Sequence, residues 1–314
     1  MKKGLLFLLS LILVLQATAQ RKDYFLIRQV ALGDAHDYPE FYHKRAKKAA
    51  KNINEYLQLA VSKRTIEAGA DSSGAYNLVY TIPVNNQRML SVSCPTPQDT
   101  ARHFLFNAAT GALISIQDIF TANGIAYLKR QLLRRYREQL KNNGREFKQE
   151  GQEKCIKADI QEFQLTTDSL IIFPGYCFTI DTSGKIPALP YKAGFSIAFL
   201  SQYLSEYGKV ILGVNKQPKL KKLHSVSVAG LYRGKIDQEE VLLQLNAPIE
   251  KSLSGTLYFT QSKKSIPFGG SFKNNRLDIP NLAERLSLTV YPGSVSGQRK
   301  AGNKVLSNFT LTRQ

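Results

Sequence analysis

The stretch that divides this chain reads Lys216-Gln217-Pro218-Lys219-Leu220-Lys221-Lys222. It is basic and contains a proline, a composition typical of a linker between domains. After it, apolar residues alternate with polar ones in short runs, which glycines and the pair Asn274-Asn275 interrupt. We therefore predict a linker over residues 216–223 and an all-β antiparallel domain over 224–314. The expected strands are Val226–Gly234, Val241–Leu245, Gly255–Thr260, Gly270–Phe272, Arg276–Ile279, Leu286–Val290 and Leu306–Thr312.

The part before the linker has a mixed pattern. Asp37 and Glu40 around Pro39 resemble a helix start, and apolar residues from Tyr42 to Ala60 then recur every three or four positions. Further amphipathic helices are expected from Ile125 to Leu140 and over Phe195–Tyr207. Alternation predicts a strand at Tyr24–Val30 and three hairpins. The hairpin arms are Tyr76–Pro83 with Arg88–Cys94, His103–Phe106 with Ala112–Ile116, and Ile160–Leu165 with Leu170–Phe173.

These patterns predict the fold class. We expect residues 20–215 to form an α+β domain, in which helices pack on an antiparallel sheet, and the small all-β domain to follow it.

The first nineteen residues have the features of a signal peptide. Lys2 and Lys3 precede an apolar run from Leu5 to Leu15, and Ala17-Thr18-Ala19 offers a small-x-small cleavage site. The apolar run is shorter than the roughly 20 residues of a membrane-spanning helix. We expect cleavage before Gln20, export to the periplasm or the medium, and a mature chain without a transmembrane span. An uncleaved anchor is the alternative.

The net charge is the most unusual feature of the composition. The chain has 43 Lys and Arg against 24 Asp and Glu, for a formal charge of +19. Without Lys2 and Lys3 the basic residues number 41, which leaves +17. This excess favours an acidic partner, and export argues against nucleic acid. A basic surface that only keeps the protein soluble is the alternative.

Three cysteines remain after cleavage, namely Cys94, Cys155 and Cys177. Disulfides persist in exported proteins. Since Cys155 and Cys177 flank the Ile160–Phe173 hairpin, we predict a bridge between them and a free, buried Cys94. No Cys-x-x-Cys or His-x-x-x-His spacing occurs, and we expect neither a metal nor a cofactor.

No motif of the sequence specifies a reaction. The four histidines are scattered, and Gly293-Ser294-Val295-Ser296-Gly297 has Val295 where a nucleophile elbow requires serine. We therefore expect a non-enzymatic protein. The best candidate for a binding surface is the outer face of the Tyr127–Lys141 helix, because arginine pairs well with phosphate and carboxylate. This anion face comprises Lys129, Arg130, Arg134, Arg137 and Lys141. Its alternative is a solvated helix face.

Two segments resemble a known family. Phe106–Phe120 is similar to a family hairpin that reads Phe-Asp-x-x-Thr-Gly-x-x-Leu-x-Leu-x-Asp-Leu-Phe, and Phe163–Phe173 is similar to Phe-x-Leu-Thr-x-x-Gly-Leu-x-Phe. The family comprises extracytoplasmic domains of RsiV-type anti-sigma factors and PdaC-type peptidoglycan deacetylases. The resemblance covers about residues 24–213 and departs at Ser169, where glycine is usual. It implies an extracytoplasmic compartment and the α+β fold more firmly than an activity.

Two functions follow as expectations. The first is an exported envelope protein that binds cell-wall glycan, peptidoglycan or another acidic polymer. The alternative is a protein-binding module that recognises a lysozyme-like hydrolase or another envelope protein, as the resemblance to the lysozyme sensors implies. Charge favours the first, because most lysozymes are cationic and would be repelled.

Overall fold

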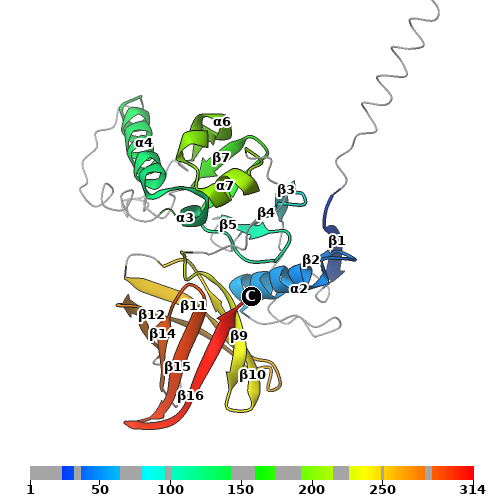
Figure 1. Ribbon diagram of the computed structural model, residues 1–314, viewed down its shortest axis with the longest axis vertical. Helices are drawn as coiled ribbons and strands as arrows, with labels where there is room; N and C mark the ends of the chain where they lie inside the picture. Colours follow the sequence, from blue (N-terminus) through cyan, green and yellow to red (C-terminus); the bar gives the residue numbers. More distant parts are fainter. Residues whose placement is uncertain are drawn as a thin grey trace, which may run out of the picture.

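The computed structural model describes residues 23–31, 37–63, 80–95, 101–142, 160, 162–173, 192–214, 226–248, 251–279 and 285–314. Of these residues 48% are in strands and 25% in helices. The expected α+β domain with a small β domain is therefore wrong. The dominant unit is a closed antiparallel barrel of eight strands, and the described N-terminal part has three small sheets in place of one (Figure 1). The predicted linker lies outside the described residues, as do the signal peptide, Cys155 and Cys177.

The barrel occupies the C-terminal part of the chain, where the sequence predicted strands. Each strand pairs with the next, and the last strand pairs with the first to close the barrel. Its strands are β9 (Gly230–Ile236), β10 (Glu239–Leu245), β11 (Ser252–Phe259), β12 (Ser265–Lys273), β13 (Arg276–Ile279), β14 (Arg285–Val290), β15 (Ser294–Ala301) and β16 (Lys304–Arg313).

Strand β15 is the barrel strand that the sequence pattern did not reveal. It contains Ser294, Ser296, Gly297 and Gln298 and only one buried branched residue, Val295. Its place depends on its neighbours, since it pairs with β14 on one side and β16 on the other. Gly297 lies opposite Phe309, and a Cβ on Gly297 would come within 2.2 Å of the Phe309 ring. The glycine thus makes room for an aromatic ring that fills the barrel.

Apolar side chains fill the barrel interior. Val241, Leu243 and Leu245 alternate along β10 and are fully buried, and Tyr232 is buried with its hydroxyl donating to the carbonyl of Val228 at 2.8 Å. Burial raises the pKa of Tyr232 to about 12. The interior is therefore a packed core, as in other small barrels whose side chains meet across the axis.

Among the described residues, the N-terminal part contains a two-stranded ribbon and two three-stranded sheets, all antiparallel. The 163–172 hairpin confirms the prediction for that segment. Thr110-Gly111 does form the predicted turn, with Gly111 at a φ of 76°, but the residues after it make only a single bridge, from Leu113 to Phe106. The strands are β1 (Leu26–Ala31) and β2 (Asp37–Tyr42), then β3 (Thr81–Asn85), β4 (Met89–Pro95) and β5 (Ala101–Asn107), and finally β6 (Phe163–Leu165), β7 (Ser169–Ile172) and β8 (Ala193–Ser196).

Two predicted helices differ from the observed ones. Asp37 begins strand β2 instead of capping a helix, and helix α2 starts only at Lys47. Residues 193–196 pair with β7, so the segment predicted as one helix over Phe195–Tyr207 is broken into short pieces. In both places strand pairing overrides the local helical pattern. The described helical segments are α2 (Lys47–Leu57), η2 (Gln58–Ser62), α3 (Ile116–Ile119), α4 (Ala122–Asn142), α6 (Ile197–Leu200), η4 (Ser201–Tyr203) and α7 (Glu206–Ile211).

Helix α2 lies against the outer wall of the barrel (Figure 1). Its apolar face packs in one cluster with Leu231, Leu242 and Tyr258, which point outward from the barrel strands. The Tyr56 hydroxyl donates to the carbonyl of Leu245 at 3.3 Å, and the Thr256 hydroxyl donates to the carbonyl of Leu59 at 3.2 Å. Helix and barrel thus share a buried interface.

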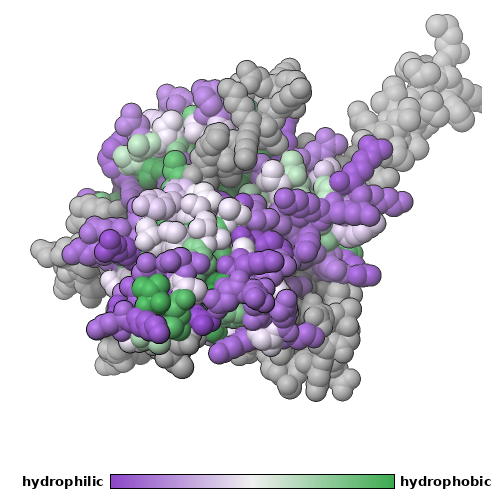
Figure 2. Space-filling view, turned by 60° about the horizontal axis from the view of Figure 1, so that its bottom comes forward, coloured by the Kyte–Doolittle hydropathy of each residue, from purple (hydrophilic) through white to green (hydrophobic). Residues whose placement is uncertain are grey.

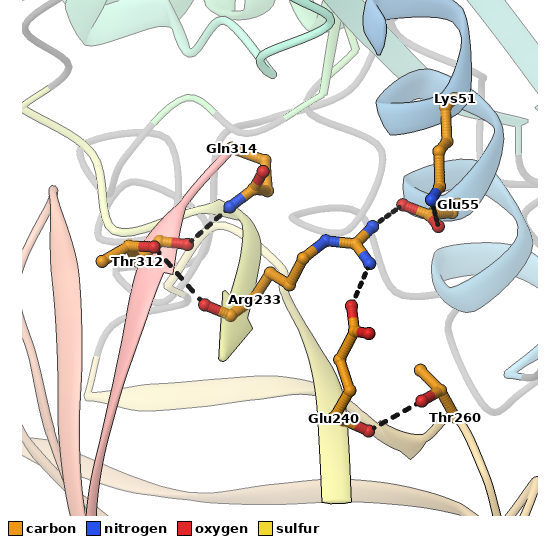
Figure 3. A network of polar contacts seen from close by, with 7 residues as sticks. All are labelled: Lys51, Glu55, Arg233, Glu240, Thr260, Thr312 and Gln314. Carbon is orange, nitrogen blue, oxygen red and sulfur yellow. Dashed lines mark hydrogen bonds and ion pairs between the residues drawn. The ribbon is translucent and has the colours of Figure 1, made fainter. Parts of the chain in front are cut away.

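An ionic cluster borders this interface (Figure 3). Arg233 of β9 donates to Glu55 of α2 and to Glu240 of β10, each at 2.5 Å. Lys51 approaches Glu55 to 3.8 Å. The cluster ties together segments that are 178 residues apart in the sequence.

Candidate functional site

The predicted anion face lies on α4, the longest of the described helices. The Thr121 hydroxyl accepts a hydrogen bond from the Gly124 amide at 3.1 Å and so caps the start of the helix. Leu128 and Leu132 are buried in the core beneath. In Figure 1, α4 lies in the upper part of the molecule, away from the barrel. The helix therefore has one face in the core and the opposite face in solvent.

Four of the five predicted residues form a continuous stripe on the solvent face. Arg130, Arg134, Arg137 and Lys141 are exposed, and their spacing of four, three and four residues places them on one side of the helix. The stripe is about 16 Å long at 1.5 Å per residue. Lys129 lies beside it and is half-buried. Arg134 has an ion pair with Glu138 at 3.5 Å, with both side chains well exposed, so this carboxylate offsets part of the positive charge of the stripe.

Three aromatic rings gather at the start of the stripe, which the sequence did not predict. Tyr127 precedes Arg130 by three residues on the same helix face. Its ring stacks on Tyr203 with centroids 4.4 Å apart, and Phe199 lies 6.1 Å away with 58% of its surface exposed. Phe199 and Tyr203 come from α6 and η4. Their position beside Tyr127 depends on tertiary packing, so only Tyr127 has a local signal.

A second basic surface surrounds an open hollow of about 1260 Å³ near the β1–β2 ribbon. Lys44, Arg45 and Arg88 line it, together with Asp23 and His43. His43 stacks on the ring of Tyr24 at a centroid distance of 4.2 Å. Positive charge is thus present on more than one face of the molecule. Figure 2 turns the barrel side forward, and hydrophilic residues cover most of the surface seen there.

The pair Ser93 and His103 is the arrangement closest to a catalytic one. The Ser93 hydroxyl lies 2.7 Å from Nδ1 of His103, and Nε2 of Gln164 donates to the same hydroxyl at 2.9 Å. Burial lowers the pKa of His103 to about 4, so the ring is neutral at ordinary pH. Its face stacks on Phe173 at 4.0 Å.

The carboxylate near this pair does not complete a triad. Glu162 accepts a hydrogen bond from the backbone amide of His103 at 2.8 Å, and among the described residues no hydrogen bond joins it to the imidazole ring. Burial raises the pKa of Glu162, while the His103 amide and the Arg102 charge oppose the rise. Ser93 itself is buried. A triad requires a base that a third group orients toward an accessible nucleophile. We interpret these contacts as a polar network that joins strand β5 to β6.

Cys94 confirms one prediction about the cysteines. It is buried in strand β4 as a free thiol, and burial raises its pKa to about 12. The predicted bridge between Cys155 and Cys177 falls outside the described residues and stays a prediction.

In the described ranges, no three His, Cys, Asp or Glu side chains gather where they could hold a metal ion. No described helix combines the length and apolar character that crossing a membrane requires. No protein-family model matches this chain, and no curated protein matches it. The resemblance to the PdaC- and RsiV-type domains therefore stays a prediction from the two segments that show it.

Proposed function

We propose that this protein is exported, that residues 1–19 are removed, and that the mature chain binds an acidic cell-envelope polymer without catalysing a reaction. The observation that supports this most strongly is the exposed stripe of Arg130, Arg134, Arg137 and Lys141 on α4. The charge of +17 after cleavage acts in the same direction.

The physical basis is electrostatic. Adjacent cations of the stripe are about 4.5–6 Å apart along the helix axis, which is less than the Debye length of about 8 Å at physiological ionic strength. The electric fields of neighbouring cations therefore add. A linear polyanion that lies along the stripe is attracted by several of these cations at the same time. The aromatic group at the start of the stripe offers a flat apolar surface beside Arg130. Sugar rings have apolar faces that pack on such rings, which favours an acidic glycan over a simple anion.

The test compares wild type with a variant in which Arg130, Arg134 and Arg137 are replaced by Gln, which keeps helix propensity and removes three charges. Binding to purified peptidoglycan and to an acidic polysaccharide is measured at low and at physiological salt. We expect the variant to bind at least about tenfold more weakly and to depend less on salt.

The matched control replaces Lys44, Lys47 and Lys48 by Gln, which removes the same charge from an exposed surface near α2. If both variants lose affinity equally, net charge alone explains binding and the stripe is not the site. If the stripe variant binds as wild type does, the proposal for α4 is wrong. N-terminal sequencing of the secreted protein tests cleavage before Gln20.

One observation favours the alternative, a protein-binding function. The β1–β2 ribbon exposes Leu26, Ile27 and Tyr42 by 57%, 38% and 45%, and Leu26 lies directly opposite Tyr42. Within the described residues these two strands pair only with each other, so the ribbon has edges to which another strand can add. Salt-resistant capture of a protein such as lysozyme, lost on replacement of Leu26 by Ser, would support this function.

A further inference from the structure

The outer face of strands β13–β16 has two rows of polar side chains, each of which runs across the four neighbouring strands. The strand register places Arg276, Thr289, Ser296 and Thr310 side by side in one row. Asp278, Ser287, Gln298 and Asn308 form the next row, two residues further along each strand. Neighbouring strands are about 4.8 Å apart and the rows about 7 Å apart, so the rows form a grid of hydroxyl and amide groups.

This grid lies at the bottom of an open hollow. The hollow has a volume of about 870 Å³, and its lining includes the residues of both rows together with Arg285 and Lys300, which are opposite each other on β14 and β15. The space matches that of ordinary small-ligand sites, which are about 300–1,000 Å³. A ligand in this hollow would contact side chains that both donate and accept hydrogen bonds.

The charges in the hollow favour an anion. Burial raises the pKa of the Asp278 carboxyl, but hydrogen bonds from Arg285 and Ser287 together with the charges of Arg285 and Lys300 outweigh this and hold the pKa below its usual value. Asp278 is therefore neutralised within the protein. Among the described residues, Arg276 and Lys300 make no side-chain hydrogen bond and no ion pair. Two cationic groups thus remain available in the hollow beside neutral polar ones.

We propose that the outer face of β13–β16 binds a carboxylate-bearing oligosaccharide of the uronic-acid type. Arg276 and Lys300 contact the carboxylates, and the hydroxyl and amide rows contact the sugar hydroxyls. This inference rests on the proposed function, since both require an acidic glycan, but it names a separate surface and the chemical class of the sugar.

The scaffold is suited to this role because it holds the grid rigidly. The strands belong to a closed barrel, and Leu288 and Phe309 pack in the core directly beneath the grid. Strand pairing fixes the backbone from which these side chains project, so binding has to order the side chains but not the backbone.

The experiment is isothermal titration of the full mature chain with three ligands. These are an oligogalacturonate, a neutral malto-oligosaccharide of equal length, and a short-chain polyphosphate that has charge without sugar hydroxyls. We expect wild type to prefer the oligogalacturonate. The variant with Arg276→Gln and Lys300→Gln should bind it at least about tenfold more weakly. The matched control, Lys251→Gln with Lys264→Gln, removes the same charge from the barrel outside the hollow and should bind as wild type does.

A second variant separates sugar recognition from charge. Ser296→Ala with Asn308→Ala should weaken binding of the oligogalacturonate and leave binding of polyphosphate unchanged. Equal binding of the neutral and acidic oligosaccharides, or wild-type affinity in the Arg276 and Lys300 variant, would overturn the inference. If that variant does not fold, chemical-shift perturbation of the wild-type backbone amides by the oligogalacturonate decides, because shifts confined to residues outside β13–β16 would also overturn the inference. The stripe variant on α4 should keep this oligosaccharide binding, so failure of the α4 proposal and of this one are distinguishable.

Discussion

Arg233 of the first barrel strand and Glu55 of α2 form an ion pair at 2.5 Å at the border of the helix–barrel interface. Both side chains are largely buried, with 22% and 16% of their surface exposed. Arg233 also forms an ion pair with Glu240, so one guanidinium pairs with two carboxylates (Figure 3). The pair is important because it joins the two parts of the chain through groups that have lost most of their water.

Replacing Glu55 by Gln should therefore destabilise the protein. Hydrogen bonds to charged groups contribute about 1.5–3 kcal/mol, and removing one partner leaves the other poorly solvated. We expect a loss of about 1–3 kcal/mol in the free energy of unfolding, measured by urea denaturation. The control is Glu40→Gln, which breaks an exposed ion pair with Arg28 and should cost less than about 1 kcal/mol. Equal losses in the two variants would contradict the buried role of Arg233.

Gly297 should tolerate no side chain while Phe309 is present. A Cβ on Gly297 would meet the Phe309 ring at 2.2 Å and Leu288 at 2.8 Å. Overpacking of this kind costs about 1–3 kcal/mol, so Gly297→Ala should lower the melting temperature. Combining this change with Phe309→Leu should restore part of the lost stability, because leucine is smaller than phenylalanine and leaves space for the added methyl group. Gly293→Ala is the control, because nothing lies within 4 Å of its Cβ position. Additive effects of the first two changes would show that the ring is not the obstacle.

Stability should depend on pH through His103. Burial lowers the pKa of its ring from 6.5 to about 4 in the folded state. As pH falls from 6.5 towards 4, the unfolded chain takes up a proton that the folded chain does not, so the free energy of unfolding falls by at most about 3 kcal/mol. Glu162 has the opposite effect on the free energy of unfolding. Because the pKa of its carboxyl is raised in the folded state, the folded chain takes up this proton more readily than the unfolded chain as pH falls.

The variant His103→Gln isolates the contribution of the ring. It keeps an acceptor for Ser93 and retains Glu162, so the difference between its pH profile and that of wild type reports His103 alone. We expect wild type to lose more stability than the variant between pH 6.5 and 4, measured by urea denaturation at a series of pH values. Parallel profiles would mean that His103 is not shielded from water.

The division into two parts leads to a prediction about fragments. Proteolysis is expected to cut near Lys216–Lys222 and to release a barrel fragment that folds by itself. The fragment would expose Leu231, Leu242 and Tyr258, which α2 covers in the whole chain. We therefore expect the isolated barrel to melt at a lower temperature than the whole chain and to associate. A fragment with no cooperative unfolding would show that the barrel requires the N-terminal part.

The candidate surfaces differ in how far the sequence could predict them. The stripe on α4 follows from the spacing of Arg130, Arg134 and Arg137 alone, because helical periodicity is local. The grid on the barrel depends on which residues lie opposite one another across four strands. Ser296 and Thr310 are 14 positions apart in the sequence, and the register of β15 on β16 places them side by side. The residues between them do not predict this register.

The basic charge, the α4 face and most of the barrel strands could be predicted from the sequence, as could the expected export signal, because each depends on composition or short-range periodicity. Tertiary contacts were needed to establish that Ser294–Ala301 is a barrel strand, that Asp37–Tyr42 is a strand, and that residues 193–196 pair with β7. The physical reason is that a strand is stabilised by partners distant in the chain. A run such as Ser296-Gly297-Gln298 has little strand preference until Leu288 and Phe309 pack around it.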